Sequence, residues 1–268
     1  MREWTLTSPE KIDLGADVRT LFAMVMRGSI RVLGTDSPNA SLEVSEIDAC
    51  PLTVRLDDDG ALRVTNGQLN AKRIAASAFS RTKGYRAVVS IAVPRDCAAE
   101  LYSAVATSVI VAGVRGRVRA NVGAGELVLG QLSGPVEADN SSGSVSAMEV
   151  SGPLTLKTVS GEVTIAGARG SVRAETVSGP LTLYATPGVG THLQLATATG
   201  AIRVGLPNLR DCTVELASEH GAITSQFAEI AVGDRGEIKE SLGLALWQLW
   251  ARTSAGDITL VKHVPADR

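Results

Sequence analysis

Glycine recurs every nine residues through the middle of the chain, and this spacing constrains the fold more than any other feature. The chain has 27 glycines in 268 residues, too few for a register of this length to arise by chance. A further glycine at 188 continues the spacing. Eight glycines are the candidate structural corners: Gly116, Gly125, Gly134, Gly143, Gly152, Gly161, Gly170 and Gly179. The sequence therefore predicts a repeat architecture.

Each of these glycines is followed by an alternating aliphatic pattern. Gly152 precedes Leu154 and Leu156, and Gly161 precedes Val163 with an isoleucine two residues later. Alternation with a period of two indicates a β-strand with one buried face. The other residues of each repeat must turn the chain, and glycine supplies the backbone freedom that a tight corner needs.

A longer period of 27 residues overlies the shorter one. Leu-x-Leu pairs begin at 127, 154 and 181, and Val-x-Ala pairs begin at 118, 145 and 172. This pattern predicts an all-β fold, a parallel β-solenoid with three nine-residue sides and 27 residues per turn. The preference of parallel crossovers predicts a right-handed solenoid.

Less regular segments flank the repeats. We expect residues 1–95 to form an N-terminal β-strand cap region continuous with the solenoid, 96–190 the regular repeats, and 191–268 degenerate repeats with a C-terminal cap. The stretch Asp57-Asp58-Asp59-Gly60 is typical of a hairpin turn. The apolar stretch from Leu242 to Ala251 has two interpretations, a strand closing the core or a membrane-surface contact, and its alternation favours the strand.

Charge and composition exclude several classes of function. The chain has 26 basic and 28 acidic residues, so it has no long-range field that would collect nucleic acid. No apolar run has the length of a membrane span, and the N-terminal residues do not resemble a secretion signal. We therefore expect a cytoplasmic protein, with peripheral membrane association left open. Cys50, Cys97 and Cys212 lie far apart and form no CxxC pair, which argues against a disulfide framework or zinc site and predicts small buried hydrophobic residues on strands.

No catalytic constellation, cofactor motif or metal-ligand spacing is evident. Three histidines, His192, His220 and His263, are far apart and lie outside any known catalytic motif. With a 27-residue turn, Arg119 and Arg173 would share an outward column with Ser146, which gives no acidic pair. We therefore expect no catalytic, cofactor-binding or metal-binding residues, no cofactor, and no enzyme activity.

Several phrases carry a family resemblance. The phrase T-V-S-G-x-[VL]-x-[VLI] occurs at 158–165 and 176–183, Val93-Pro94 precedes the repeats, and 253–260 reads TSAGDITL. Together with the alternating N-terminal segments, these phrases resemble the bacterial putative-adhesin β-strand-repeat family, in an actinobacterial-type form. The resemblance covers almost the whole chain. It implies a domain of unknown function without established catalytic residues, and it hints at a link to the cell envelope.

These features predict a non-catalytic scaffold. We expect a rigid platform for a protein partner or for self-association in bacteria. A surface adhesin or glycan-binding protein is the alternative, and a solenoid carbohydrate-active enzyme is the second alternative.

Overall fold

The protein is an all-β structure that divides into two compact units. The computed structural model describes residues 1–16, 18–48, 50–66, 86–105, 107–231 and 236–263. These residues form 25 strands and no helix. Unit 1 comprises residues 1–140, and unit 2 comprises residues 141–268. The prediction of an all-β solenoid is confirmed, because each unit contains two sheets of mainly parallel strands.

Unit 1 has two sheets whose strands alternate along the chain. The first sheet has the order β1 (Arg2–Leu6), β6 (Leu52–Leu56), β7 (Ala61–Asn66), β3 (Thr20–Val25), β9 (Ala98–Ser103), β11 (Val118–Val122) and β13 (Val136–Ser142). The second has the order β2 (Glu10–Ala16), β5 (Asn39–Ile47), β8 (Arg86–Pro94), β4 (Arg27–Thr35), β10 (Thr107–Ala112) and β12 (Leu127–Gly130).

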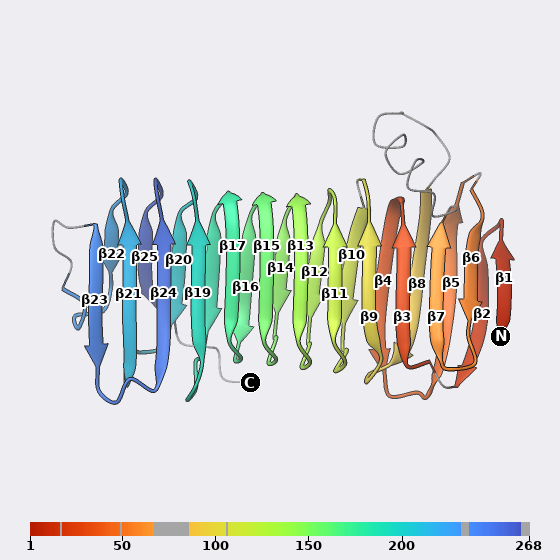
Figure 1. The fold of residues 1–268 in the computed structure, drawn as a ribbon, viewed down its shortest axis with the longest axis horizontal. Helices are drawn as coiled ribbons and strands as arrows, with labels where there is room; N and C mark the ends of the chain where they lie inside the picture. The colour runs from red at the N-terminus through yellow and green to blue at the C-terminus, as the bar shows by residue number, and fades with distance from the viewer. Residues whose placement is uncertain (17, 49, 67–85, 106, 232–235, 264–268) are drawn as a thin grey trace. The chain divides into compact units, whose positions relative to one another are not determined.

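The order of strands in unit 1 is not the order of the chain. Strands β3 and β4 lie beside β9 and β10, and the later strands β7 and β8 lie on their other side (Figure 1). Antiparallel pairs occur toward the β1 and β2 edges, where β6 pairs with β1 and β5 pairs with β2. The predicted hairpin turn is confirmed, because β6 and β7 pair antiparallel across Asp57 to Gly60.

Unit 2 repeats the two-sheet arrangement. Its first sheet has the order β15 (Leu154–Ser160), β17 (Val172–Ser178), β19 (His192–Thr197), β24 (Trp247–Thr253), β21 (Cys212–Ser218) and β23 (Glu237–Leu242). Its second sheet has the order β14 (Val145–Met148), β16 (Val163–Ala168), β18 (Leu181–Ala185), β20 (Ile202–Leu206), β25 (Ile258–Lys262) and β22 (Ile223–Ser225).

The last two strands of unit 2 lie inside their sheets. β24 pairs with β19 on one side and with β21 on the other, and β25 lies between β20 and β22. The predicted alternation is present in β24, because Trp247, Leu249 and Ala251 are buried. Leu244 precedes the strand and is 76% exposed. Residues 247–251 of the apolar stretch therefore belong to a core strand, whereas residues 243–246 form an exposed connection, and the strand does not close the end of the sheet.

The predicted 27-residue turn is wrong, because one turn takes 18 residues. In unit 1, Val118 pairs with Val136, and in unit 2, Leu154 pairs with Val172, each 18 positions further along. Each turn therefore has two nine-residue sides, one in each sheet, and the solenoid is flattened rather than triangular.

Residues 27 positions apart lie in opposite sheets, so the 27-residue period does not describe a stack of side chains. One turn brings the small pair Val172 and Ala174 of β17 together with the large pair Leu181 and Leu183 of β18. All four side chains are at most 2% exposed. The preceding turn instead combines the large pair Leu154 and Leu156 of β15 with Val163 and Ile165 of β16, so the pair sizes are not compensated turn by turn. The size pattern along the chain therefore does not report the number of sides per turn.

The eight predicted corner glycines lie in the turns between the two sheets. Gly125, Gly143, Gly161 and Gly179 lie where the chain passes from the first sheet to the second. Gly116, Gly134, Gly152 and Gly170 lie at the return turns. At Gly161 φ is +124°, and a Cβ there would lie closer than 3.0 Å to the carbonyl oxygen of Gly143. Stacked turns therefore approach each other too closely for a side chain at this corner.

Most letters of the T-V-S-G phrase have a structural explanation in unit 2. Thr176 is buried, and its Oγ1 donates a hydrogen bond to the carbonyl oxygen of Ser178, 3.4 Å away. Ser178 Oγ donates to the carbonyl of the preceding turn at 3.3 Å. Gly179 passes close to the preceding corner, as Gly161 does. Only the side chain of Val177, a residue that is 54% exposed, contributes neither to the core nor to the turn.

Candidate functional site

The titratable groups that the sequence singled out are separate in the structure. His220 Nδ1 lies 3.0 Å from the carbonyl oxygen of Ser254, and the His263 ring lies 4.5 Å from the Tyr184 ring. Among the described residues, no group of three His, Cys, Asp or Glu side chains is placed to hold a metal ion. Likewise, no helix in the described part of the chain is long and apolar enough to cross a membrane.

Two of the three cysteines are buried as predicted. Burial raises the pKa of the Cys97 thiol to about 12 and that of the Cys212 thiol to about 11. A thiol with such a pKa holds its proton at neutral pH and is a poor nucleophile. Cys50 is only half-buried, and it lies in the connection before β6 rather than on a strand.

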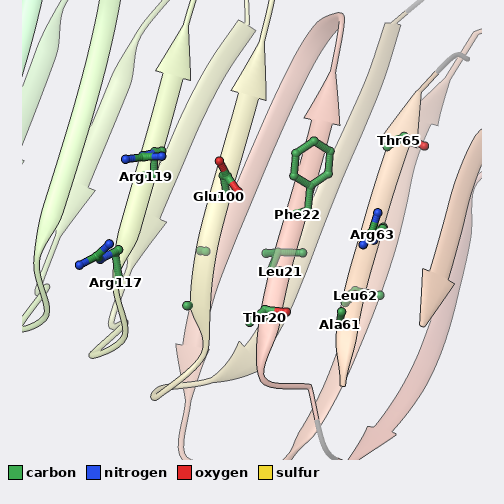
Figure 2. Close-up of a pocket in the computed structure, with 12 residues that line it drawn as sticks. Thr20, Leu21, Phe22, Ala61, Leu62, Arg63, Thr65, Glu100, Arg117 and Arg119 are labelled. Atoms are coloured by element: carbon green, nitrogen blue, oxygen red, sulfur yellow. The ribbon is translucent and has the colours of Figure 1, made fainter. Parts of the chain in front are cut away.

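A hollow lies on the outward face of the first sheet of unit 1 (Figure 2). Its volume is about 570 Å³, which is within the range of small-molecule sites. It extends over four neighbouring strands, β7, β3, β9 and β11. The lining residues are Thr20, Leu21, Phe22, Ala61, Leu62, Arg63, Thr65, Ala98, Ala99, Glu100, Arg117 and Arg119.

Small outward side chains create this hollow. Thr20 pairs with Ala61 on one side and with Ala98 on the other, so three small residues form a row across three strands. The next outward row, two residues along each strand, is large: Arg63, Phe22 and Glu100. Because paired strands lie roughly 4.8 Å apart, the small row forms a trough beside the large one.

Arginines surround the trough and differ in their pairing. Arg119 Nη2 lies 2.7 Å from Glu137 Oε2, and this hydrogen bond, together with the carboxylate charge, raises the pKa of Arg119. Arg63 Nε lies 3.7 Å from Asp57 Oδ2. Arg117 is exposed, and its side chain has no ion pair among the described residues. The lining residues therefore include three guanidinium groups and one carboxylate.

The two aromatic rings beside the trough contact each other. The ring centroids of Phe22 and Tyr102 are 5.4 Å apart, and both side chains are half-buried. Tyr102 donates a hydrogen bond to Glu100 Oε1 at 2.6 Å, which raises the pKa of the phenol because the bond and the nearby carboxylate both favour its protonated form. The hydrogen bond thereby orients the Tyr102 ring beside Phe22.

Sequence reasoning missed this hollow. Its floor depends on the pairing of β3 with β7 and β9, strands that are not consecutive in the chain. The sequence also predicted that Arg119 would share an outward column with Ser146 and Arg173, and this prediction is wrong. Arg119 instead pairs with Glu100 and Glu137 in the neighbouring strands. The one signal in the sequence was the alternation of Arg117 and Arg119 around a buried valine.

An apolar ridge lies along one edge of unit 2. Val159 and Val177 occupy equivalent places in successive turns and are 55% and 54% exposed. Ala198 takes the corresponding place in the next turn and is also exposed. The two valines are the residues of the repeated phrase that the packing of the solenoid leaves unexplained.

The fold and the surface define a class of protein: a flattened parallel β-solenoid whose notable surface feature is an open trough. The chain belongs to the Toastrack DUF4097 family, whose pattern matches residues 24–261. The predicted family resemblance is thereby confirmed, while the actinobacterial-type assignment stays a prediction. No curated protein matches the chain.

Two solved structures are similar to the chain over nearly its full length. One is a putative cell adhesion protein from Clostridium sporogenes, with 13% identity, a TM-score of 0.28, and coverage of 96% of this chain and 100% of that one. The other is a putative adhesin from Bacteroides fragilis, with 11% identity, a TM-score of 0.48, and coverage of 96% and 98%.

Proposed function

We propose that this protein is a non-catalytic β-solenoid that serves as a rigid interaction platform, binding a protein partner through the outward face of the first sheet of unit 1. The aromatic pair Phe22 and Tyr102, half-exposed and flanked by arginines, is the observation that carries this proposal. Aromatic residues and arginine are enriched in the energetically dominant centres of protein interfaces. Aromatics make up only 3% of this chain, so their pairing on an outward face calls for a function.

Rigidity supports the same proposal. Phe22 lies on β3, which is hydrogen-bonded to neighbours on both sides and buries its alternate residues in the core. A backbone held in this way loses little conformational freedom when a partner binds, which favours affinity.

Photo-crosslinking in the organism that makes the protein tests the proposal. A photoreactive amino acid in place of Phe22 is expected to give a discrete protein adduct, either with another protein or with a second copy. The matched control replaces Tyr184, a half-buried aromatic on β18 in the other unit. Absence of an adduct at position 22, or equal adducts at both positions, would contradict the proposal.

The cytoplasmic location is part of the proposal and is tested separately. Fractionation of native cells is expected to place the protein in the cytoplasm or at the inner side of the membrane. Recovery of the protein outside the cell would instead favour the adhesin alternative.

A further inference from the structure

The charges around the trough differ from those of the chain as a whole. The chain carries 26 basic and 28 acidic residues, whereas the trough is lined by three arginines and one glutamate. That glutamate, Glu100, already accepts the hydroxyl hydrogen bond of Tyr102. The carboxylates of Asp57 and Glu137 offset Arg63 and Arg119, so Arg117 is the lining arginine without an ion pair among the described residues.

The arginines are not equally available to a partner. Arg119 is bound to Glu137 through both Nε and Nη2, at 3.2 and 2.7 Å. Arg63 is 63% exposed and shares Asp57 with Arg55, whose Nε is closer to that carboxylate at 2.7 Å. Arg117 is exposed at the far end of the trough. Arg117, just before β11, therefore provides an available guanidinium group, and Arg63 on β7 provides a second one that is only loosely paired with Asp57.

The backbone of this face offers little to a ligand. β7, β3, β9 and β11 are consecutive in the sheet, and each has a paired neighbour on both sides. An added strand has no edge to pair with here, so recognition must use side chains. A bound segment would place an apolar group on the floor formed by Ala61, Thr20 and Ala98, against the Phe22 ring.

We propose that the trough binds an acidic segment of a protein partner, with an apolar side chain seated beside Phe22 and carboxylates meeting Arg63 and Arg117. This inference rests on the proposed function, since it specifies the partner's chemistry at the same face. Complementary charge speeds association and excludes basic partners, and Arg binds carboxylates with two parallel hydrogen bonds.

Fluorescence polarisation with a defined probe tests this inference. The probe is a short fluorescein-labelled peptide of glutamates around two central leucines, and its match has glutamine in place of every glutamate. The acidic peptide is expected to bind and the glutamine peptide is not. Binding should weaken steeply when NaCl rises to about 0.5 M, because exposed charges are screened.

Single substitutions locate the bound peptide. Arg117→Gln is expected to weaken binding about threefold, in keeping with an exposed ion pair. Phe22→Ala should weaken it further by removing apolar contact, and urea unfolding of each variant verifies that the fold is retained. Arg203→Gln on β20 is the matched control, since it removes an exposed arginine from the other unit.

Three outcomes would overturn the inference: no binding of the acidic peptide, equal loss in Arg203→Gln, or binding of a trigalacturonate probe in its place. The crosslinking experiment separates its failure from that of the proposed function. If the adduct at position 22 persists when Arg63→Gln and Arg117→Gln are combined, the platform stands and the acidic partner does not. If no adduct forms, the platform itself is refuted.

Discussion

Alanine substitutions at four glycines of unit 2 test the corner geometry, because one glycine has both a positive φ and a close neighbouring atom, two have only one of these features, and one has neither. Gly161 has both a positive φ of +124° and a close carbonyl neighbour. Gly200 has the close neighbour alone, Gly190 has a positive φ of +77° alone, and Gly188 has neither. The four variants therefore separate the two costs.

The expected changes follow from this geometry. Gly188→Ala should raise the free energy of unfolding by roughly 0.4 to 1 kcal/mol, since alanine restricts the unfolded chain. Gly190→Ala should lower it by about 1 kcal/mol because of the left-handed backbone. Gly200→Ala should lower it by roughly 1 to 3 kcal/mol, since the stacked turns must move apart. Gly161→Ala combines both costs and should lower it by about 3 to 5 kcal/mol.

Urea unfolding followed by tryptophan fluorescence measures these differences, and the buried Trp247 reports on unit 2. The expected order of stability is Gly188→Ala, wild type, Gly190→Ala, Gly200→Ala, Gly161→Ala. If Gly161→Ala were as stable as Gly188→Ala, the close stacking of corners would be refuted. If Gly190→Ala and Gly200→Ala exchanged places, backbone strain rather than contact would dominate.

Three further predictions concern the core. Leu154→Asp should unfold the protein at room temperature or lower its thermal midpoint sharply, because it places an unpaired charge in an apolar stack at a cost of several kcal/mol. A thermal midpoint that circular dichroism finds unchanged would contradict the assigned inner face. Thr253→Val should lower the free energy of unfolding by roughly 2 kcal/mol, since the Thr253 hydroxyl makes two buried hydrogen bonds. Thr176→Val should lower it by less than about 1 kcal/mol, because the Thr176 hydroxyl makes one long hydrogen bond. Equal urea midpoints for the two variants would refute this ranking. Because burial raises the thiol pKa values of Cys97 and Cys212, both cysteines should resist Ellman's reagent at pH 8 until urea unfolds the chain. Their contribution to the free energy of unfolding is full below about pH 9 and is lost as the pH rises toward 11 and 12. Unfolding free energies that stay constant over this pH range would contradict the burial of the two thiols.

The nine-residue repeat predicted the strands and their inward faces well. Leu154, Leu156, Val163 and Ile165 were predicted to point inward, and all are at most 2% exposed. The number of sides per turn was not predictable in this way, because a nine-residue side is compatible with two sides or three. The pairing register decides, because residues 18 positions apart are hydrogen-bonded neighbours, and the size pattern along the chain does not report this register.

The trough could not be predicted for a different reason. Its residues come from β7, β3, β9 and β11, and the neighbours of β3 are fixed only when the chain returns. The small outward residues Ala61, Thr20 and Ala98 are unremarkable in their own strands. They become a floor only when the register places them in one row.

The position of β24 and β25 has a consequence for how the protein is made. Both strands lie inside their sheets, so β21 and β22 have no direct partner in β19 and β20. During synthesis on the ribosome, the strands of residues 212–242 must wait beside an open slot until residues 247–262 have emerged. Completion of the sheets of unit 2 is thereby coupled to completion of translation, and a chain stalled before residue 247 leaves β19, β20, β21 and β22 each with an unpaired edge of the kind that favours intermolecular pairing.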